Sequence, residues 1–331
     1  MYYQPISQCK GGRPADAPSL AGGPCWFEHA LCRTRGKTPE RVHWRDIPSD
    51  VLDRLTSPRA MLCGMTLDRP RVMGILNVTP DSFSDGGLYD RPDMARLHAE
   101  EMAEQGADLL DIGGESTRPG AAFVPAGDEI NRVIPAIEQV ADLGLPISID
   151  TRKAQVAKAA LTAGAAMVND VSGLCFDPDM APFIAQSGVP VCIMHAQGDP
   201  KTMQASPHYD DVLLDVYYWL ETQIVTAEAV GIARTQIIVD PGIGFGKTLD
   251  HNLALLKGIS LFHALGCPIL LGVSRKRFIG VIGDAPEPAH RVAGSVALAL
   301  DAAAQGVQIL RVHDTRETVQ ALALWRAVQG E

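Results

Sequence analysis

Short apolar runs alternate with helical patterns eight times along this chain, and each run ends in polar residues. The runs cover residues 71–78, 107–114, 146–151, 167–173, 190–195, 237–242, 268–274 and 308–314. The helical patterns cover 93–105, 128–143, 153–163, 178–187, 211–230, 249–263, 288–305 and 315–328. Nearly continuous apolar runs are typical of parallel strands covered on both faces. Eight β-then-α units predict a (β/α)8 TIM barrel, with a doubly wound open sheet as the alternative.

Residues 1–70 lack this rhythm. They are rich in glycine and proline and contain only short patterned pieces. We expect a strand over Trp26–Cys32, one or two helical turns over Val51–Leu55 and a small hairpin over Arg59–Leu67. The sequence therefore predicts an N-terminal accessory extension over 1–70 and a barrel over 71–331.

Charge and cysteine content limit the function. The 331 residues include 29 Lys and Arg against 39 Asp and Glu, a formal net charge of −10. This argues against nucleic acid or an anionic membrane as a partner, so an anionic substrate needs a local cationic pocket. The seven cysteines are scattered without a C-x-x-C pair, which predicts free thiols, no zinc site and no disulfide. With no apolar signal core and no apolar run of transmembrane length, we expect a cytoplasmic protein.

Polar residues stand at the end of every predicted strand. Each alone has an ordinary structural explanation, as a helix cap, a turn residue or a hydrogen-bonded core histidine. In a barrel, however, the carboxyl ends of all strands meet at one mouth, where active sites lie. The sequence therefore predicts an active site from these ends: Asn77, Asp111, Asp150, Asn169, Asp170, His195, Asp240, Ser274, Arg275, Lys276, Arg311 and His313.

Two kinds of chemistry follow from these residue types. Carboxylate and amide groups at Asp150, Asn169 and Asp240 suit a flat ligand with an amino-amide edge, such as a pterin or guanine ring. Lys276 is expected to hold a ring carbonyl. A second, cationic set is expected to bind phosphate, and it comprises Arg118, Arg311 and His313. Asn77, beside loop carboxylates, is expected to help hold a hydrated Mg²⁺, which takes few protein ligands.

Two glycine-containing loops need separate interpretations. The segment 242–248 resembles a Walker loop, but Pro241 occupies the place of the first glycine, and the spacing does not fit a dinucleotide fingerprint. We interpret it as a tight loop that brings Phe245 close to a ligand. The segment 74–87 starts as a buried strand and opens into a polar loop, which is either a solvated connection or a lid over the site.

Nine segments together resemble the dihydropteroate synthase family and occur in family order over about 71–331. They are GILNVTPDSFSDGG (74–87), DIGGESTRPGA (111–121), SIDTRK (148–153), NDVSG (169–173), MH (194–195), HYDDV (208–212), DPGIGFGK (240–247), GVSRK (272–276) and RVHD (311–314). The resemblance implies a transferase of folate synthesis that joins 6-hydroxymethyl-7,8-dihydropterin diphosphate to 4-aminobenzoate, releasing diphosphate. It also implies Mg²⁺ as cofactor, a homodimer, and inhibition by sulfonamides, which mimic 4-aminobenzoate.

The resemblance also assigns roles to individual residues. The pterin is held by Asp150, Asn169, Met194, Asp240, Gly272, Lys276 and Arg311. The 4-aminobenzoate site is shaped by Thr117, Pro119, Phe245 and Ser274. The diphosphate is bound by Arg118, Arg311 and His313, and Asn77 helps to place Mg²⁺. We expect the catalytic residues to be Phe83, Asp85, Arg118, Asp150 and Lys276, with Phe83 and Asp85 as a hypothesis of our own. One departure is Ala196, where the family usually has a larger side chain.

Bond breaking at the pterin CH₂–O is expected to come early, because the ring delocalises the resulting cation. We hypothesise that Phe83 and Asp85 close over that cation and exclude water. Three rivals remain: a corrinoid-linked methyltetrahydrofolate methyltransferase, a catalytically silent pterin-binding paralog, and a (β/α)8 phosphosugar enzyme. The first handles no diphosphate, the second should have lost key residues such as Asn77 and Lys276, and the third needs no groups for an amino-amide ring edge.

Overall fold

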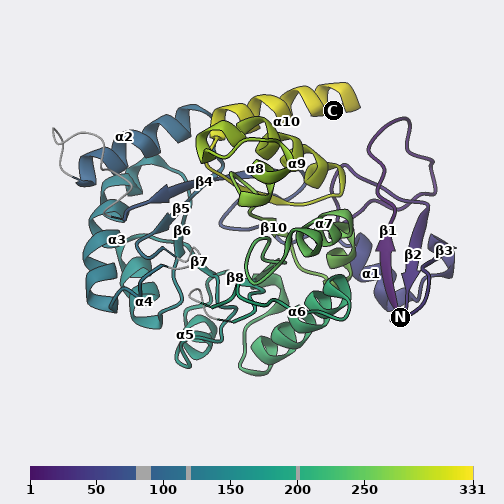
Figure 1. Cartoon of the computed structure of the whole chain (residues 1–331), viewed down its shortest axis with the longest axis horizontal. Coiled ribbons are helices and arrows are strands. Elements are labelled where there is room, and N and C mark those ends of the chain that lie inside the picture. The colour runs from purple at the N-terminus through teal and green to yellow at the C-terminus, as the bar shows by residue number, and fades with distance from the viewer. Residues whose placement is uncertain (80–90, 117–120, 199–201, 331) are drawn as a thin grey trace.

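The predicted barrel is confirmed by a computed structural model that describes residues 1–79, 91–116, 121–198 and 202–330 (Figure 1). Eight parallel strands form one sheet in the order β10-β11-β4-β5-β6-β7-β8-β9. Their bounds are β4 (Arg71–Asn77), β5 (Leu109–Gly113), β6 (Ile147–Asp150), β7 (Met167–Asp170), β8 (Val191–Met194), β9 (Ile237–Asp240), β10 (Leu270–Leu271) and β11 (Ile309–Val312). A parallel bridge between Val239 and Ile269 joins the two edges. The sheet therefore closes on itself, and the doubly wound alternative is wrong.

Helices surround the barrel at the positions that the periodicity indicates (Figure 1). They are α2 (Arg91–Glu104), α3 (Ala126–Val140), α4 (Ala154–Ala163), α5 (Met180–Ser187), α6 (Val212–Ala229), α7 (Leu249–Lys257), α9 (Val292–Ala304) and α10 (Thr315–Gln329). The predicted helix over 249–263 is interrupted at Gly258 and continues as the 3-10 helix η5 (Ile259–Leu265). A short helix that the sequence did not indicate, α8 (Arg277–Ile282), follows the seventh strand of the barrel.

The barrel interior is apolar toward the amino-terminal ends of the strands. One buried cluster contains a side chain from each of seven strands: Met73, Leu109, Met167, Cys192, Ile238, Leu270 and Ile309. Leu62 and Leu67, from the predicted hairpin over Arg59–Leu67, belong to the same cluster, and an antiparallel bridge joins Leu62 to Met65. This hairpin therefore packs against the amino-terminal end of the barrel, where it excludes water.

The N-terminal extension is a three-stranded antiparallel sheet followed by one helix. Its elements are β1 (Tyr2–Pro5), β2 (His29–Arg33), β3 (Glu40–His43) and α1 (Ser49–Thr56). The predicted strand at Trp26 begins three residues later, at His29. The extension binds η5, since the Ser260 hydroxyl donates to the Pro5 carbonyl at 2.8 Å and Arg54 Nε donates to the Ala264 carbonyl at 2.9 Å. These contacts lie away from the carboxyl ends of the strands.

The prediction that all seven cysteines are free is wrong, because Cys9 and Cys25 form a disulfide. An antiparallel bridge between Gln8 and Trp26 brings their neighbours face to face, with the two cysteine Cα atoms 4.7 Å apart. No spacing rule in the sequence reports this pairing.

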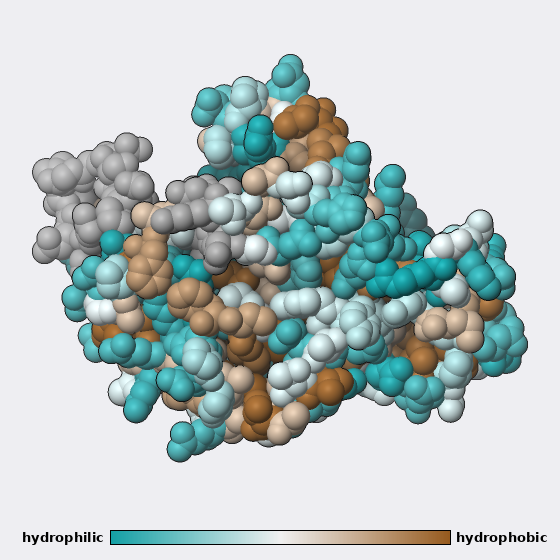
Figure 2. All heavy atoms as spheres, turned by 60° about the horizontal axis from the view of Figure 1, so that its bottom comes forward, coloured by the Kyte–Doolittle hydropathy of each residue, from teal (hydrophilic) through white to brown (hydrophobic). Residues whose placement is uncertain are grey.

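No helix in the described parts of the chain is both long and apolar enough to cross a bilayer. On the face shown in Figure 2, hydrophobic groups form separate patches between hydrophilic ones.

Candidate active site at the carboxyl ends of the strands

The side chains that point into the barrel change from apolar to mostly polar within two residues along the strands, toward their carboxyl ends. Because successive side chains of a strand point to opposite faces, a residue two positions after an interior apolar residue also points inward. Leu109 is followed in this way by Asp111, and Ile309 by Arg311. Met167, Cys192, Ile238 and Leu270 are followed in the same way by Asn169, Met194, Asp240 and Gly272. Five of the predicted pterin residues therefore share one level of the barrel: Asn169, Met194, Asp240, Gly272 and Arg311.

Arg311 is the centre of this polar level. Its Nε donates to Asp111 Oδ2 at 2.5 Å, and its Nη2 donates to Asp150 Oδ2 at 2.7 Å. Asn169 Nδ2 donates to the same Asp111 oxygen at 3.1 Å. Four strands, β5, β6, β7 and the distant β11, thus contribute to one hydrogen-bonded set. The two aspartates raise the pKa of Arg311, in opposition to its burial, so this guanidinium stays charged.

Two carboxylate oxygens of this set have no partner among the described residues. Asp111 Oδ1 and Asp150 Oδ1 are buried and accept no hydrogen bond, and the Ser148 hydroxyl beside them is also unsatisfied. Buried polar atoms are almost always paired, so unpaired acceptors at this end of the barrel indicate a ligand with N–H donors. The amino and ring N–H groups of a pterin supply such donors.

Burial disfavours the charged form of the aspartates at this mouth. It raises the pKa of Asp150 to about 7, although Arg311 acts in the opposite direction. Burial likewise raises the pKa of Asp240 to about 6, although the Gly242 N–H, which donates to its Oδ1 at 2.7 Å, and Lys276 lower it. Carboxylates whose pKa is raised this far by burial are typical of binding sites.

The loop after β9 brings Phe245 next to Lys276. Lys276 Nζ lies 4.3 Å from the centre of the Phe245 ring, a cation–π contact. The loop packs tightly on the segment after β8, because a Cβ on Gly242 would lie 1.8 Å from the His195 carbonyl oxygen. Only glycine fits there, and its φ of 68° is in the region that favours glycine.

Sequence reasoning missed the function of Lys247 in this loop. Its buried Nζ lies 2.9 Å from His195 Nδ1 and donates to the Phe245 carbonyl at 2.9 Å. Burial lowers the pKa of Lys247 to about 7. The lysine that makes the loop look like a nucleotide-binding motif is instead directed into the protein, where it holds the loop in place. Its position directly after a glycine-rich loop gave no signal of this role.

The last two strands bring Ser274 and His313 together. The Ser274 hydroxyl accepts a hydrogen bond from the His313 backbone N–H at 3.1 Å and lies 3.0 Å from His313 Nδ1. A predicted 4-aminobenzoate residue and a predicted diphosphate residue are therefore neighbours. The structure thus places the described members of the predicted pterin, 4-aminobenzoate and diphosphate sets around the carboxyl ends of the strands.

Five predicted residues lie outside the described residues: Phe83, Asp85, Thr117, Arg118 and Pro119. Their predicted roles stay predictions. Asn77 is half-buried at the end of β4, and its neutral amide oxygen suits one ligand position on a Mg²⁺ ion that keeps waters. Within 1–79, 91–116, 121–198 and 202–330, no group of three or more His, Cys, Asp or Glu side chains could hold a metal.

A second network supports the strand ends from outside the mouth. Glu115 Oε2 accepts from Lys153 Nζ at 2.8 Å, and Lys153 Nζ also donates to Glu129 at 2.5 Å. The guanidinium of Arg152 donates to Glu115 as well. The Val124 N–H donates to Glu115 Oε1 at 3.0 Å. These four buried charges join the segments that follow β5 and β6.

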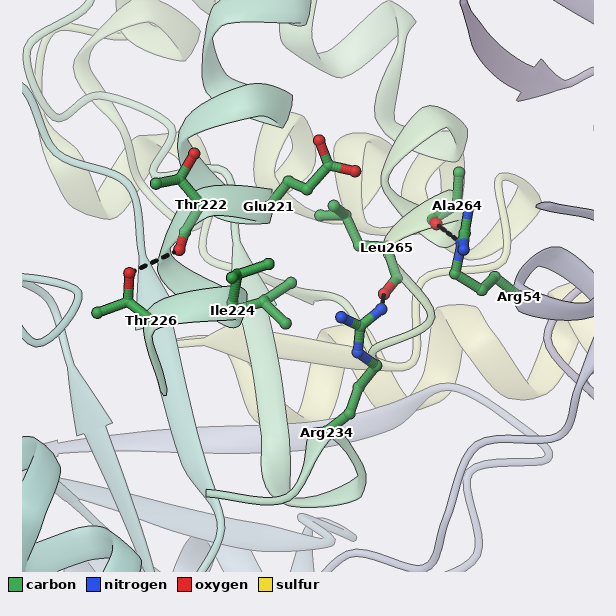
Figure 3. A pocket seen from close by; sticks show the side chains of 9 residues that line it. Arg54, Glu221, Thr222, Ile224, Thr226, Arg234, Ala264 and Leu265 are labelled. Atoms are coloured by element: carbon green, nitrogen blue, oxygen red, sulfur yellow. Dashed lines mark hydrogen bonds between the residues drawn. The ribbon is translucent and has the colours of Figure 1, made fainter. Parts of the chain in front are cut away.

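A surface pocket of about 370 Å³ lies elsewhere, between α1, α6 and η5 (Figure 3). Its two arginines are already paired, since Arg54 donates to the Ala264 carbonyl and Arg234 to the Leu265 carbonyl and to Glu228. Arg234 and Leu265 precede strands of the barrel, so the pocket is near the amino-terminal ends of those strands. It contains none of the predicted site residues.

The fold and the site define a (β/α)8 barrel whose mouth is built for a pterin, and comparison with known proteins agrees. A family described as "Pterin binding enzyme" matches residues 73–313. The chain belongs to this family.

The match extends to one kind of enzyme within the family. Dihydropteroate synthase of Escherichia coli K12 is 47% identical over 264 residues, which is 80% of this chain and 93% of the relative. A Xanthomonas albilineans dihydropteroate synthase structure with 4-aminobenzoic acid is 50% identical, has a TM-score of 0.78, and is matched over 83% of this chain and 100% of that one. A second structure from that organism, with 7,8-dihydropteroate, is 48% identical with a TM-score of 0.74, covering 81% and 96%. The chain is thus a member of the dihydropteroate synthases, transferases of folate biosynthesis.

Proposed function

We propose that this chain condenses 6-hydroxymethyl-7,8-dihydropterin diphosphate with 4-aminobenzoate at the barrel mouth, giving 7,8-dihydropteroate and diphosphate. The observation that carries the proposal is the polar level around Arg311, where one buried carboxylate oxygen each of Asp111 and Asp150 has no donor among the residues that the structure describes. A pterin supplies these donors from one edge of its ring. Asp240 and Asn169 complete the wall that faces that edge.

Bond changes in the proposed reaction are simple to state. The CH₂–O bond of the pterin breaks, and diphosphate leaves with the electron pair. The amine nitrogen of 4-aminobenzoate then forms the new C–N bond and loses a proton. Since an aromatic amine is weakly basic, it attacks as the free amine and needs no strong general base.

The side chains of this chain stabilise charge and exclude water. Arg311 and His313 face the leaving diphosphate, and Lys276 with Phe245 forms the wall between the two substrates. By family likeness, Arg118 joins the diphosphate set. Asp85 and Phe83 close over the cation by our own hypothesis. A Mg²⁺ ion, with Asn77 as a ligand, would add positive charge at the diphosphate. We further propose that the protein is a homodimer in the cytoplasm, on family likeness alone.

The test is an assay of purified protein with labelled 4-aminobenzoate and pterin diphosphate, with and without Mg²⁺. We expect labelled dihydropteroate and an equal amount of diphosphate, and both should fall strongly without Mg²⁺. Methyl transfer from methyltetrahydrofolate to a corrinoid, with no labelled pteroate, would instead support the methyltransferase rival. Pterin binding without any product would support the silent paralog.

A further inference from the structure

Arg275 lies in a strained turn between two of the predicted substrate residues. The Lys276 N–H donates to the Val273 carbonyl at 3.3 Å, which closes a turn over residues 273–276. At the third position of this turn, Arg275 has a φ of 56°. Turns with a positive φ there normally carry glycine or asparagine. A long side chain in this conformation persists only where its surroundings hold it.

Three contacts hold Arg275 in this conformation. Its guanidinium forms a forked ion pair with Asp314, in which Nε lies 3.1 Å from Oδ2 and Nη2 contacts Oδ1. Its backbone N–H donates to the Ser295 hydroxyl at 2.9 Å, and its carbonyl accepts from Arg291 Nη1 at 2.9 Å. The ion pair with Asp314 is the strongest of these contacts, because both groups are charged and two guanidinium N–H groups each reach a carboxylate oxygen.

Asp314 is used in an unusual way. It is the N-cap residue of α10, where an aspartate side chain ordinarily accepts a hydrogen bond from the first turn of the helix. Here the side chain makes no capping hydrogen bond, and its two oxygens contact Arg275 instead. Asp314 is also 7% exposed, so this ion pair is shielded from water on one side. Its carboxylate thus serves the turn rather than the helix.

Residues that are predicted to bind substrate lie next to both Arg275 and Asp314 in the sequence. Ser274 and Lys276 flank Arg275, and His313 precedes Asp314. The Ser274 hydroxyl is hydrogen-bonded to His313. The segments after β10 and β11 are therefore joined twice, once by Ser274 with His313 and once by Arg275 with Asp314.

We propose that Arg275 and Asp314 are a positioning pair, which holds Ser274, Lys276 and His313 in register across the two last strands. The pair acts through these neighbours and does not itself need to contact a substrate. The inference rests on the proposed function for its activity readout. Its structural part, the register of His313, can be measured without any substrate.

A double-mutant cycle tests the pair. Arg275→Gly removes the fork but accommodates the positive φ, and Asp314→Asn removes the charge without the loss of a capping bond. We expect each single change to lower kcat/KM for pterin diphosphate by about tenfold, as for loss of a charged hydrogen bond. The double variant should be no worse than the poorer single variant. Independent effects that multiply to about a hundredfold loss would overturn the proposal.

The apo protein gives a second readout. In ¹H–¹⁵N NMR spectra without substrate, the His313 ring signals should shift equally in both single variants and in the double variant. Unchanged His313 signals would overturn the proposal even if activity falls. This measurement remains decisive if the wild-type protein makes no dihydropteroate, because that result would refute the proposed function and leave the register test intact.

A matched control pair lies near the surface pocket. Arg234 and Glu228 form a similar fork, with Nε–Oε1 2.9 Å and Nη2–Oε2 2.8 Å (Figure 3 shows Arg234). Arg234→Gly and Glu228→Gln should lower the melting temperature but leave kcat/KM and the His313 signals unchanged. Equal losses of activity from this distant pair would show a general effect of stability and would contradict a positioning role for Arg275 and Asp314.

Discussion

Arg311 on β11 and Asp111 on β5 form an ion pair across the barrel interior, with 2.5 Å between Nε and Oδ2. Asp111 is fully buried, and it also accepts from Asn169. It therefore fixes the planes of two groups that are predicted to meet the pterin. The sequence marked Asp111 only as a polar strand end, and the structure gives it a partner.

Asp111→Asn should weaken the hold on Arg311. A hydrogen bond to a charged group contributes roughly 1.5–3 kcal/mol, so we expect kcat/KM for pterin diphosphate to fall by roughly 10- to 100-fold. Steady-state kinetics checks this. Asp108→Asn, which breaks a comparable pair with Arg69 and Arg71 at the other end of the barrel, is the control and should leave kcat/KM unchanged. Equal kinetics for the Asp111 variant and wild type would refute this role.

Asp240 should make stability depend on pH. Its pKa is about 6 in the folded protein and 3.8 without burial, so the folded state retains the proton that the unfolded state loses. Its contribution is therefore most favourable below about pH 4, declines as pH rises to about 6, and then stays constant. The full change is roughly 3 kcal/mol. Asp150 and Asp170 have raised pKa values too, so only the difference between variant and wild type isolates Asp240.

Asp240→Asn is the corresponding variant. An amide does not ionise, so the variant should be more stable than wild type at pH 8 by up to about 3 kcal/mol and nearly equal to it at pH 4. It should also lose pterin binding. Urea denaturation at several pH values with calorimetric titration of a pterin checks both. A constant stability difference across pH would contradict the raised pKa.

Lys247→Met should affect one substrate more than the other. Methionine has a similar length but no donor, so His195 Nδ1 and the Phe245 carbonyl lose their partner. Since Phe245 lines the predicted 4-aminobenzoate site, we expect KM for 4-aminobenzoate to rise about tenfold, with a loss of about 1–3 kcal/mol in stability. Kinetics with each substrate varied in turn measures this. The control Lys257→Met removes an exposed amine and should leave both KM values unchanged. If Lys247→Met raised KM for pterin diphosphate more than KM for 4-aminobenzoate, this explanation would be wrong.

Sulfonamides should compete with 4-aminobenzoate alone. The wall formed by Phe245 and Lys276 adjoins Ser274 and would receive either aromatic amine. We expect inhibition that disappears at saturating 4-aminobenzoate and persists at saturating pterin diphosphate. Inhibition kinetics with both substrates varied distinguishes these cases. Full activity under saturating sulfonamide at low 4-aminobenzoate would show that the two do not share a site.

The barrel was predictable because its signal is repeated. Each strand is a short apolar run that is followed by polar residues, so the positions of β4 through β11 follow from local pattern. Helix α8 has only six residues, too few to establish a helical period. The disulfide depends on how residues 8 and 26 pair, which periodicity does not report.

The residue types at the mouth were predictable, but their partners were not. Arg311 contacts aspartates 200 and 161 positions away, and strand order alone does not decide which carboxylate it takes. Lys247 follows glycines that look like a phosphate loop, and only its position in space shows that its amine is directed inward. The positive φ of Arg275 could not be predicted from the sequence either, because arginine rarely occupies that turn position.

A crystal structure of the protein with bound pterin tests the central claim most directly. The account predicts one flat ring in the barrel mouth, with Asp111 Oδ1 and Asp150 Oδ1 each accepting an N–H from the ring or from an ordered water beside it. Asp240 and Asn169 should meet the amino-amide edge, and Arg311 should lie against the same ring. A pterin bound away from Asp240 and Arg311, with both aspartate oxygens still unpaired, would contradict the account.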